Sequence, residues 1–303
     1  MELVIEILRS TLSVSIPILL AALGGLMTLH ANVFNISMEG MLLTGSFFAV
    51  LGSYFFESWI MGVLLGILSG VIMSLIFALF VLKIKAGEFI TGIAINTFSV
   101  GLTTYLLRAI FKVKGTLISP KIVGIPKFDI PLLNKIPYLS DIFNGHSFIV
   151  YLSIIVIVPL INYIVFKTPF GLHLRGVGLN RNVMSSIGIN PDKIKLKAIL
   201  ACGFLCGLGG AFLSLGYMTM FIENMSNGRG WTSLATVILT NGKPYAVMIV
   251  SLIFGLMEGI GFSLQTFNVP SQITSTLPYL SVLVALYINS RTVKNKVKIE
   301  KNE

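Results

Sequence analysis

The stretch IMGVLLGILSGVIMSLIFALFVL, residues 60–82, decides the fold class because it contains no charged side chain and ends at Lys83. A helix rises about 1.5 Å per residue, so a run of this length crosses a hydrocarbon core of roughly 30 Å. Helices satisfy their own backbone hydrogen bonds in lipid, whereas barrel strands would give short segments of alternating hydrophobicity. The stretch therefore predicts a membrane-spanning helix.

The composition extends this prediction to the whole chain. Of 303 residues, 55% are hydrophobic and 11% are charged, against about 45–50% and 25% in an average soluble domain. We therefore expect an all-α, polytopic helical membrane protein with one transmembrane domain over residues 1–303. The net charge of +10, without a soluble surface to carry a groove, indicates contact with membrane lipid and no binding of nucleic acid.

About nine membrane segments are expected. They are residues 12–29, 41–56, 60–82, 89–111, 147–166, 197–220, 245–267 and 273–289, with a short apolar piece, 231–240, counted as one crossing. Pro17 is expected to break the first segment early, and residues 1–10 to lie on the membrane surface.

Basic residues predict the orientation, since Lys and Arg in short loops favour the cytoplasmic side. A loop over 167–196, a tail over 290–303 and the turn at Lys83 and Lys85 are basic, so all three are expected to be cytoplasmic. The Pro-rich loop 112–146 is expected to be external, which places the N-terminus outside.

Two polar interruptions predict broken helices, one in each half. LHANVFNISMEGMLLTG covers residues 29–45, and NMSNGRGWTSLATVILTNGKP covers residues 224–244. Unwound backbone at membrane depth is tolerated only within protein or beside a cavity, so we expect a polar path at these interruptions.

Five side chains are candidates for this path: Asn35, Glu39, Asn96, Trp231 and Glu258. An ionisable group at membrane depth indicates function by default. The alternatives are a carboxylate stabilised by a helix N-terminus for Glu39, and a structural hydrogen bond for Glu258. Asn96 either joins helices or lines the cavity, and Trp231 could stack on a planar ligand.

Catalytic and metal-binding chemistry is not expected in this chain. Cys202 and Cys206 are four residues apart in an apolar segment and are interpreted as small packing residues. The sequence has no convincing His/Glu metal constellation or Ser/Lys pair and no Walker sequence. We expect no catalytic residue, metal or cofactor, and the chain is not predicted to be an enzyme.

The polar stretch RGVGLNRNVMSSIGINPDKIK, residues 175–195, predicts one short helix. Asn180 can cap about two turns that Gly188 ends, with Val183, Met184 and Ile187 on or near one face. A helix this short is marginal alone. Its apolar side chains indicate a docking partner or the membrane surface.

Several segments, in this order and spacing, resemble permease subunits of bacterial ATP-binding-cassette (ABC) importers of the ribose and nucleoside type. The resemblance covers nearly the whole chain and is closest to the shorter permease of nucleoside importers with a basic-membrane-protein-type receptor. The segments are FNISMEGMLLTGSF (34–47), GIAINTFSVGLT (92–103), GLNRNVMSSIGIN (178–190), GRGWTSLATVILTNGKP (228–244) and LIFGLMEGI (252–260).

The resemblance implies a function, partners and a location. The short helix, at Asn180, Val183, Met184, Ile187 and Gly188, would fit a groove on a separate ATP-binding subunit that uses ATP and Mg. The other partners would be a second permease, making a heterodimer, and an external substrate-binding lipoprotein. The location would be the bacterial cytoplasmic (inner) membrane, and the substrate a nucleoside or related molecule.

Other readings stay open, and the chain departs from the family pattern. Sugar and riboflavin are alternative substrates, and an ion-coupled transporter with Glu39 or Glu258 as its proton site is an alternative class. Leu29 and His30 stand where the family usually has an acidic-basic pair, which puts an ion pair there in doubt.

Overall fold

The computed structural model describes residues 2–128 and 142–265, together with 276–277, 280–283 and 287. Within these residues, seven helices are long and apolar enough to cross a membrane. They are Ile5–His30, Met38–Phe56, Trp59–Lys83, Glu88–Phe111, Phe148–Lys167, Pro191–Met218 and Pro244–Gln265.

The described elements follow one another along the chain in a single order. The helices are α1 (Glu2–His30), α2 (Met38–Phe56), α3 (Trp59–Ala78), η1 (Leu79–Lys83, a π-helix), α4 (Glu88–Phe111), α6 (Phe148–Tyr151), η3 (Leu152–Ile157, a π-helix), α7 (Val158–Lys167), α8 (Pro169–Leu179), α9 (Arg181–Ser186), α10 (Pro191–Ala211), η4 (Phe212–Met218, a π-helix), α11 (Arg229–Leu239) and α12 (Pro244–Gln265). Two antiparallel strand pairs join β1 (Thr116–Leu117) to β4 (Phe221–Ile222) and β2 (Lys127–Phe128) to β3 (His146–Ser147).

The expected number of nine crossings is not confirmed by the described residues. The α11 helix has 11 residues, which at about 1.5 Å each is too short to span a bilayer. The expected crossing at 273–289 falls largely outside the described residues. The structure therefore supports seven candidate spans.

The prediction that Pro17 breaks the first helix is wrong. The α1 helix runs from Glu2 through Pro17 to His30 without interruption, and residues 5–10 belong to its candidate span instead of forming a separate surface segment. A proline removes one helical hydrogen bond. Contacts with α10, α11 and α12 stabilise α1 along its length, so tertiary packing overrides the local preference.

Three helices, α2, α3 and α10, pack through a glycine seam formed by Gly45, Gly66, Gly70, Gly203 and Gly207. A Cβ added at Gly207 would lie 2.6 Å from the carbonyl oxygen of Gly66, and one added at Gly45 would lie 2.9 Å from the Cα of Gly207. The backbones are therefore in direct contact, as small residues permit between membrane helices.

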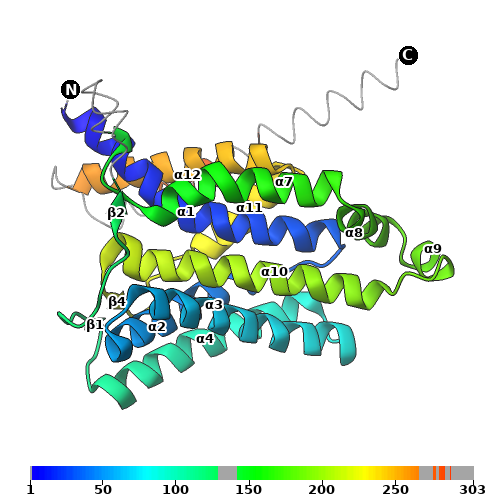
Figure 1. Cartoon of the computed structure of the whole chain (residues 1–303), viewed down its shortest axis with the longest axis horizontal. Coiled ribbons are helices and arrows are strands. Elements are labelled where there is room, and N and C mark those ends of the chain that lie inside the picture. Colours follow the sequence, from blue (N-terminus) through cyan, green and yellow to red (C-terminus); the bar gives the residue numbers. More distant parts are fainter. Residues whose placement is uncertain (1, 129–141, 266–275, 278–279, 284–286, 288–303) are drawn as a thin grey trace.

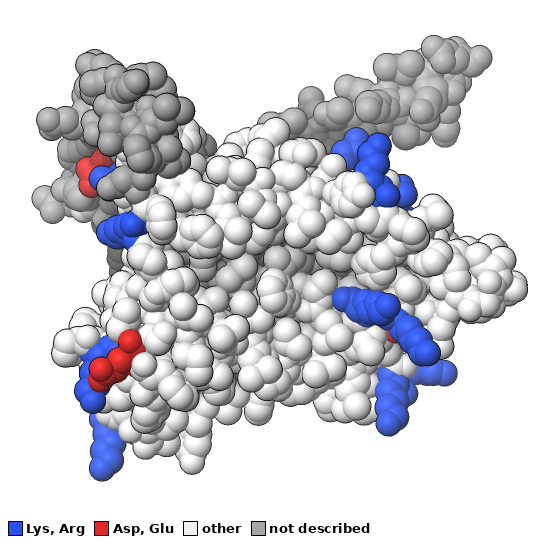
Figure 2. Space-filling model, in the orientation of Figure 1, with Lys and Arg blue, Asp and Glu red and all other residues white. Residues whose placement is uncertain are grey.

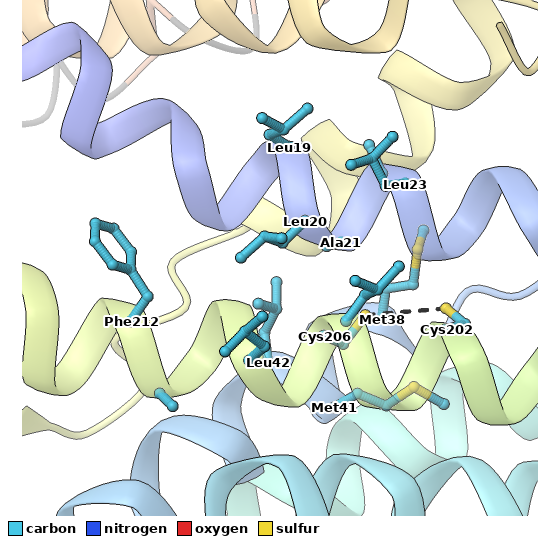
Figure 3. Close-up of a cluster of buried hydrophobic side chains, with 14 of the residues drawn as sticks. Leu19, Leu20, Ala21, Leu23, Met38, Met41, Leu42, Cys202, Cys206 and Phe212 are labelled. Atoms are coloured by element: carbon cyan, nitrogen blue, oxygen red, sulfur yellow. Dashed lines mark hydrogen bonds between the residues drawn. The ribbon is translucent and has the colours of Figure 1, made fainter. Parts of the chain in front are cut away.

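The apolar core surrounds α1. Leu20 and Leu23 are fully buried, and Leu20 faces Leu42 of α2 while Leu23 lies on the opposite side of α1 with Leu19 (Figure 3). Cys202 and Cys206 are buried and unbridged, with their sulfur atoms 3.9 Å apart. The interpretation of both cysteines as packing residues is confirmed.

The two ends of the bundle carry the charges. The strand pair β1–β4 lies at one end, and α8 and α9 lie at the opposite end, with α9 projecting beyond the long helices (Figure 1). On the face shown in Figure 2, acidic and basic side chains gather at the two ends and leave an uncharged band between them. This distribution is typical of a protein that spans a membrane.

Candidate functional site

Both predicted interruptions contain non-helical segments that connect separate helices. After α1 ends at His30, the chain turns at Asn32 (φ 52°) and starts α2 beside the interior of α1. A Cβ on Gly25 would lie 2.7 Å from the sulfur of Met38, so α2 begins more than a turn inside the end of α1. In the other half, Gly228 (φ 81°) precedes the short α11 helix.

Glu39 joins the N-termini of these two helices. It lies in the first turn of α2, and its carboxylate accepts hydrogen bonds from the N–H groups of Gly228 (2.8 Å) and Gly230 (2.6 Å) at the start of α11. Both helix dipoles favour a negative charge there. The interpretation of Glu39 as a carboxylate stabilised by a helix N-terminus is therefore confirmed. The N–H groups that it binds belong to α11 and not to its own helix, α2.

Glycine is required at this junction. A Cβ on Gly230 would lie 2.5 Å from the Cα of Glu39, which is far inside ordinary contact distance. The absence of a side chain lets the two helix ends meet.

Asn96 fixes α4 to the start of α2. Its Oδ1 accepts a hydrogen bond from the N–H of Gly40 (2.8 Å), and its Nδ2 donates one to the carbonyl of Ile36 (3.1 Å). Both polar ends of the amide are used. Asn96 thus joins helices and also borders a cavity.

An open cavity of about 670 Å³ lies among α2, α4 and the segment leading into α11. Its polar lining consists of Glu39, Asn96, Thr97, Asn224, Asn227 and Trp231. The volume lies in the range of small-molecule sites. The structure therefore brings three of the five predicted path residues, Glu39, Asn96 and Trp231, to one cavity.

The other two predicted path residues lie outside this cavity. Asn35 is buried, and its Oδ1 accepts hydrogen bonds from the N–H (3.0 Å) and hydroxyl (2.6 Å) of Ser37, while its Nδ2 donates to the sulfur of Cys202 (3.3 Å). Asn35 thus shapes the turn before α2. Glu258, on α12, forms an ion pair with Arg229 at the start of α11.

Arg229 was not among the residues predicted for this site. Its side chain is 5% exposed and that of Glu258 is 12% exposed, so the pair is withdrawn from solvent. Arg229 also donates a hydrogen bond to the carbonyl of Met225 (3.1 Å). The sequence does contain a signal for it, since Arg229 stands between Gly228 and Gly230 in a largely apolar part of the chain. A buried charge in a membrane segment requires a partner, so an ion pair could have been predicted.

His30 connects three segments at the α9 end of the bundle. Its Nε2 lies 2.9 Å from the carbonyl oxygen of Gly242, and its ring meets the edge of Phe166 with centroids 5.8 Å apart. The guanidinium of Arg175 lies 5.2 Å from the centroid of the same Phe166 ring. Among the described residues His30 forms no ion pair, and it acts through these contacts.

The α9 helix has the predicted cap and end. The Asn180 side chain accepts hydrogen bonds from the N–H groups of Asn182 (3.0 Å) and Val183 (3.2 Å), and Gly188 follows the helix with φ 83°. A side-chain N-cap and a left-handed glycine stabilise short helices.

The apolar residues of α9 divide into two groups. Val183 is 56% exposed and Ile187 is 64% exposed, whereas Met184 is 8% exposed and packs against Gly176 of α8. Met184 therefore holds α9 against α8, and Val183 with Ile187 forms an exposed apolar surface, called here the tip surface.

Comparisons with known proteins match residues 7–286 to the family described as the permease component of the branched-chain amino acid transport system. The guanosine ABC transporter permease protein NupQ of Bacillus subtilis is 30% identical, and the match covers 92% of this chain and 90% of that protein. The nucleoside ABC transporter permease protein NupC of Lactococcus lactis is 28% identical over the same shares, 92% and 90%. A putative glucose ABC transporter permease protein, TsgC13 of Haloferax volcanii, is 25% identical over 92% of this chain and 90% of its own. The chain therefore belongs to the branched-chain amino acid transport system permease family, as a multi-pass inner-membrane ABC permease subunit that is not itself an enzyme.

Proposed function

We propose that this permease subunit forms part of an importer path for nucleosides, and that a separate ATP-binding subunit, which uses ATP and Mg, drives it through α9. An external substrate-binding lipoprotein would deliver the solute. A second, different permease would complete the path. The tip surface supports the coupling part of this proposal, because α9 lies at the end of the bundle (Figure 1) and its Val183 and Ile187 are more than half exposed.

The cavity supports a neutral, planar solute with polar edges. Trp231 is 42% exposed and offers a ring for stacking. Asn96, Asn224 and Asn227 provide amides that suit the edges of a nucleobase or the hydroxyls of ribose. No cationic side chain borders this cavity within the described part of the chain, so a phosphorylated solute would have no counter-charge there.

The open side of the cavity supports a second permease. The cavity is bordered by α2, α4 and the chain around the start of α11, and α4 exposes Phe89, Ile90 and Phe98. A second permease packed on this side would close the path and cover apolar surface. Glucose and riboflavin remain the alternative substrates to be separated by experiment.

The ion-coupled alternative is weakened by the partners of both carboxylates. Glu39 accepts two backbone hydrogen bonds, and Glu258 is paired with Arg229. Neither carboxylate is therefore an unpartnered ionisable group in the cavity. Membership of an ABC permease family also disfavours a transporter that works alone.

Uptake by the complete importer in proteoliposomes tests the substrate. With ATP inside the vesicles, labelled guanosine should accumulate, and unlabelled nucleosides should compete while glucose, ribose and riboflavin should not. Trp231→Ala should lower uptake at least about fivefold, since stacking contributes about 1–3 kcal/mol per base. Competition by glucose alone would overturn the nucleoside proposal.

ATP hydrolysis by the same complex tests the coupling role. Val183→Asp and Ile187→Asp would force a charge into an apolar groove on the ATP-binding subunit, so substrate-stimulated hydrolysis should fall to the basal rate. Ser185→Asp is the matched control, because it adds the same charge at an exposed position on another side of α9. Equal loss in all three variants would contradict a specific tip surface.

A further inference from the structure

A second groove lies between η1, the end of α3 and the start of α10, at the end of the bundle that carries α9. Its volume is about 430 Å³. The wall consists of apolar side chains: Leu75, Ala78, Leu79, Leu82 and Leu196. Leu75 and Leu79 are 45% and 47% exposed, so the groove opens sideways from the bundle.

The groove is apolar along its length and basic at one end. Lys83 and Lys193 border that end with Asn190 and Asp192. The Asp192 carboxylate binds Arg181 through Oδ2 at 3.0 Å, whereas neither lysine forms an ion pair among the described residues. Two free cations therefore face the mouth of an apolar channel.

The dimensions match one leaflet of a bilayer. From Leu75 to Lys83 the helix rises about 12 Å at 1.5 Å per residue, which is close to half of a roughly 30 Å hydrocarbon core. Trp59–Lys83 is a candidate membrane span, so the leucine wall lies at acyl-chain depth when Lys83 is at the interface. The lysines would then lie where phosphate groups are found.

We propose that this groove is a binding site for one anionic phospholipid. An acyl chain lies along the leucine wall, and the headgroup phosphate is held between Lys83 and Lys193. Basic pockets between membrane helices on the cytoplasmic side bind anionic headgroups in this way. Because α10 follows α9 after a short turn through Gly188 and Asn190, the bound lipid would touch the helix next to the one that carries the tip surface.

The test is lipid retention by the purified, complete importer, measured by native mass spectrometry after exchange into mixed phosphatidylglycerol and phosphatidylcholine with identical acyl chains. We expect selective retention of phosphatidylglycerol. Lys83→Gln with Lys193→Gln should weaken it by about 20- to 30-fold, from roughly fivefold for each lysine near an anionic surface. Lys112→Gln with Lys114→Gln, on the loop that leads to β1 at the opposite end, is the matched control and should retain the lipid.

A second variant separates the groove from general surface charge. Leu79→Trp would fill the channel from an exposed position and should abolish retention while both lysines remain. Equal retention of both lipids by the unmodified complex would overturn the proposal. So would undiminished retention in the double lysine variant, or a cross-link from Leu196→Cys to a partner subunit, which would show that protein covers the groove. The measurement requires no transport, so it is independent of the proposed substrate.

Discussion

The centre of the bundle and the tip surface reverse the usual placement of side chains. Arg229 at the start of α11 and Glu258 on α12 are charged and nearly buried. In contrast, Val183 and Ile187 at the α9 end are apolar and more than half exposed. The buried charges have their partners within this chain. The exposed apolar side chains have no covering partner within the described residues.

The contrast shows that the buried charges find their partners within this chain, whereas the tip surface is proposed to find its partner in another protein. A buried ion pair is costly to form but strongly destabilising to break, so it fixes the position of α11 relative to α12. Fully burying a Val or Ile side chain contributes about 1.5–3 kcal/mol. The tip surface can therefore stabilise a complex without contributing to the stability of the isolated permease.

The largest effect should come from breaking the central pair. Arg229→Leu leaves Glu258 buried and unpaired, which should destabilise the protein by about 3–5 kcal/mol. Thermal unfolding of the purified permease should show a much lower midpoint. Adding Glu258→Leu should restore most of the loss, and a single variant as stable as the parent would contradict the importance of the pair.

Glu39→Gln should have a smaller effect on the same region. The amide presents one acceptor oxygen in place of two, so one of the N–H groups of Gly228 and Gly230 loses its charge-assisted bond. We expect a loss of about 1.5–3 kcal/mol, measured by chemical unfolding. No change in stability would mean that α11 is held by Arg229 alone.

Two substitutions on α9 test the division between its apolar residues. Met184→Ala should destabilise the α8–α9 contact by about 2 kcal/mol, because a buried side chain is removed. Val183→Ala should change stability by less than about 0.5 kcal/mol and yet reduce substrate-stimulated ATP hydrolysis. The rate at which a protease cleaves α9 from the purified permease measures the stability of the α8–α9 contact in each variant. Equal cleavage rates for Met184→Ala and Val183→Ala would contradict the buried role of Met184.

The smallest effect should be a pH dependence at the end opposite the tip surface. His146, outside the candidate spans, is bonded to Ser13 through Nδ1 (2.9 Å) and to the carbonyl of Ile142 through Nε2 (2.8 Å). Burial lowers the pKa of His146 below its usual 6.5; the Ile142 bond opposes this, and the positive charges of Arg9 and Lys127 add to the lowering.

The direction in which stability changes with pH follows from where His146 takes up its proton. Below pH 6.5 the unfolded chain binds a proton at this histidine before the folded protein does, so stability should fall from pH 6.5 down to the lowered pKa and level off below it. Unfolding midpoints measured across this range for the parent and for His146→Gln should differ in slope. Identical slopes would exclude His146 as the source.

Much of the helix arrangement was predictable because apolar length alone decides a crossing. The residues around Asn180 and Gly188 were also predictable, since caps are local signals. Pro17 was misread because the contacts that hold α1 straight come from other helices. The Arg229–Glu258 pair was missed because it depends on which helices lie side by side, and the sequence does not state that.

The direction of the Asn35 side chain is a further feature of the site that the sequence could not predict. The spacing of the polar residues marked the interruption correctly, but not the direction of each side chain. Glu39 reaches the cavity, while Asn35, four residues earlier, turns toward Ser37 and Cys202. Backbone geometry in a non-helical turn decides that direction.

The glycine seam has a mechanical consequence for the route from the tip surface to the cavity. Where Gly207 touches Gly66 and Gly45, no flexible side chain lies between the helices to absorb a shift. If an ATP-binding subunit displaces α9 as proposed, a shift passed on to α10 would therefore move α2 together with it. Glu39 lies in the first turn of α2, so the same movement would reach the two hydrogen bonds that hold the start of α11.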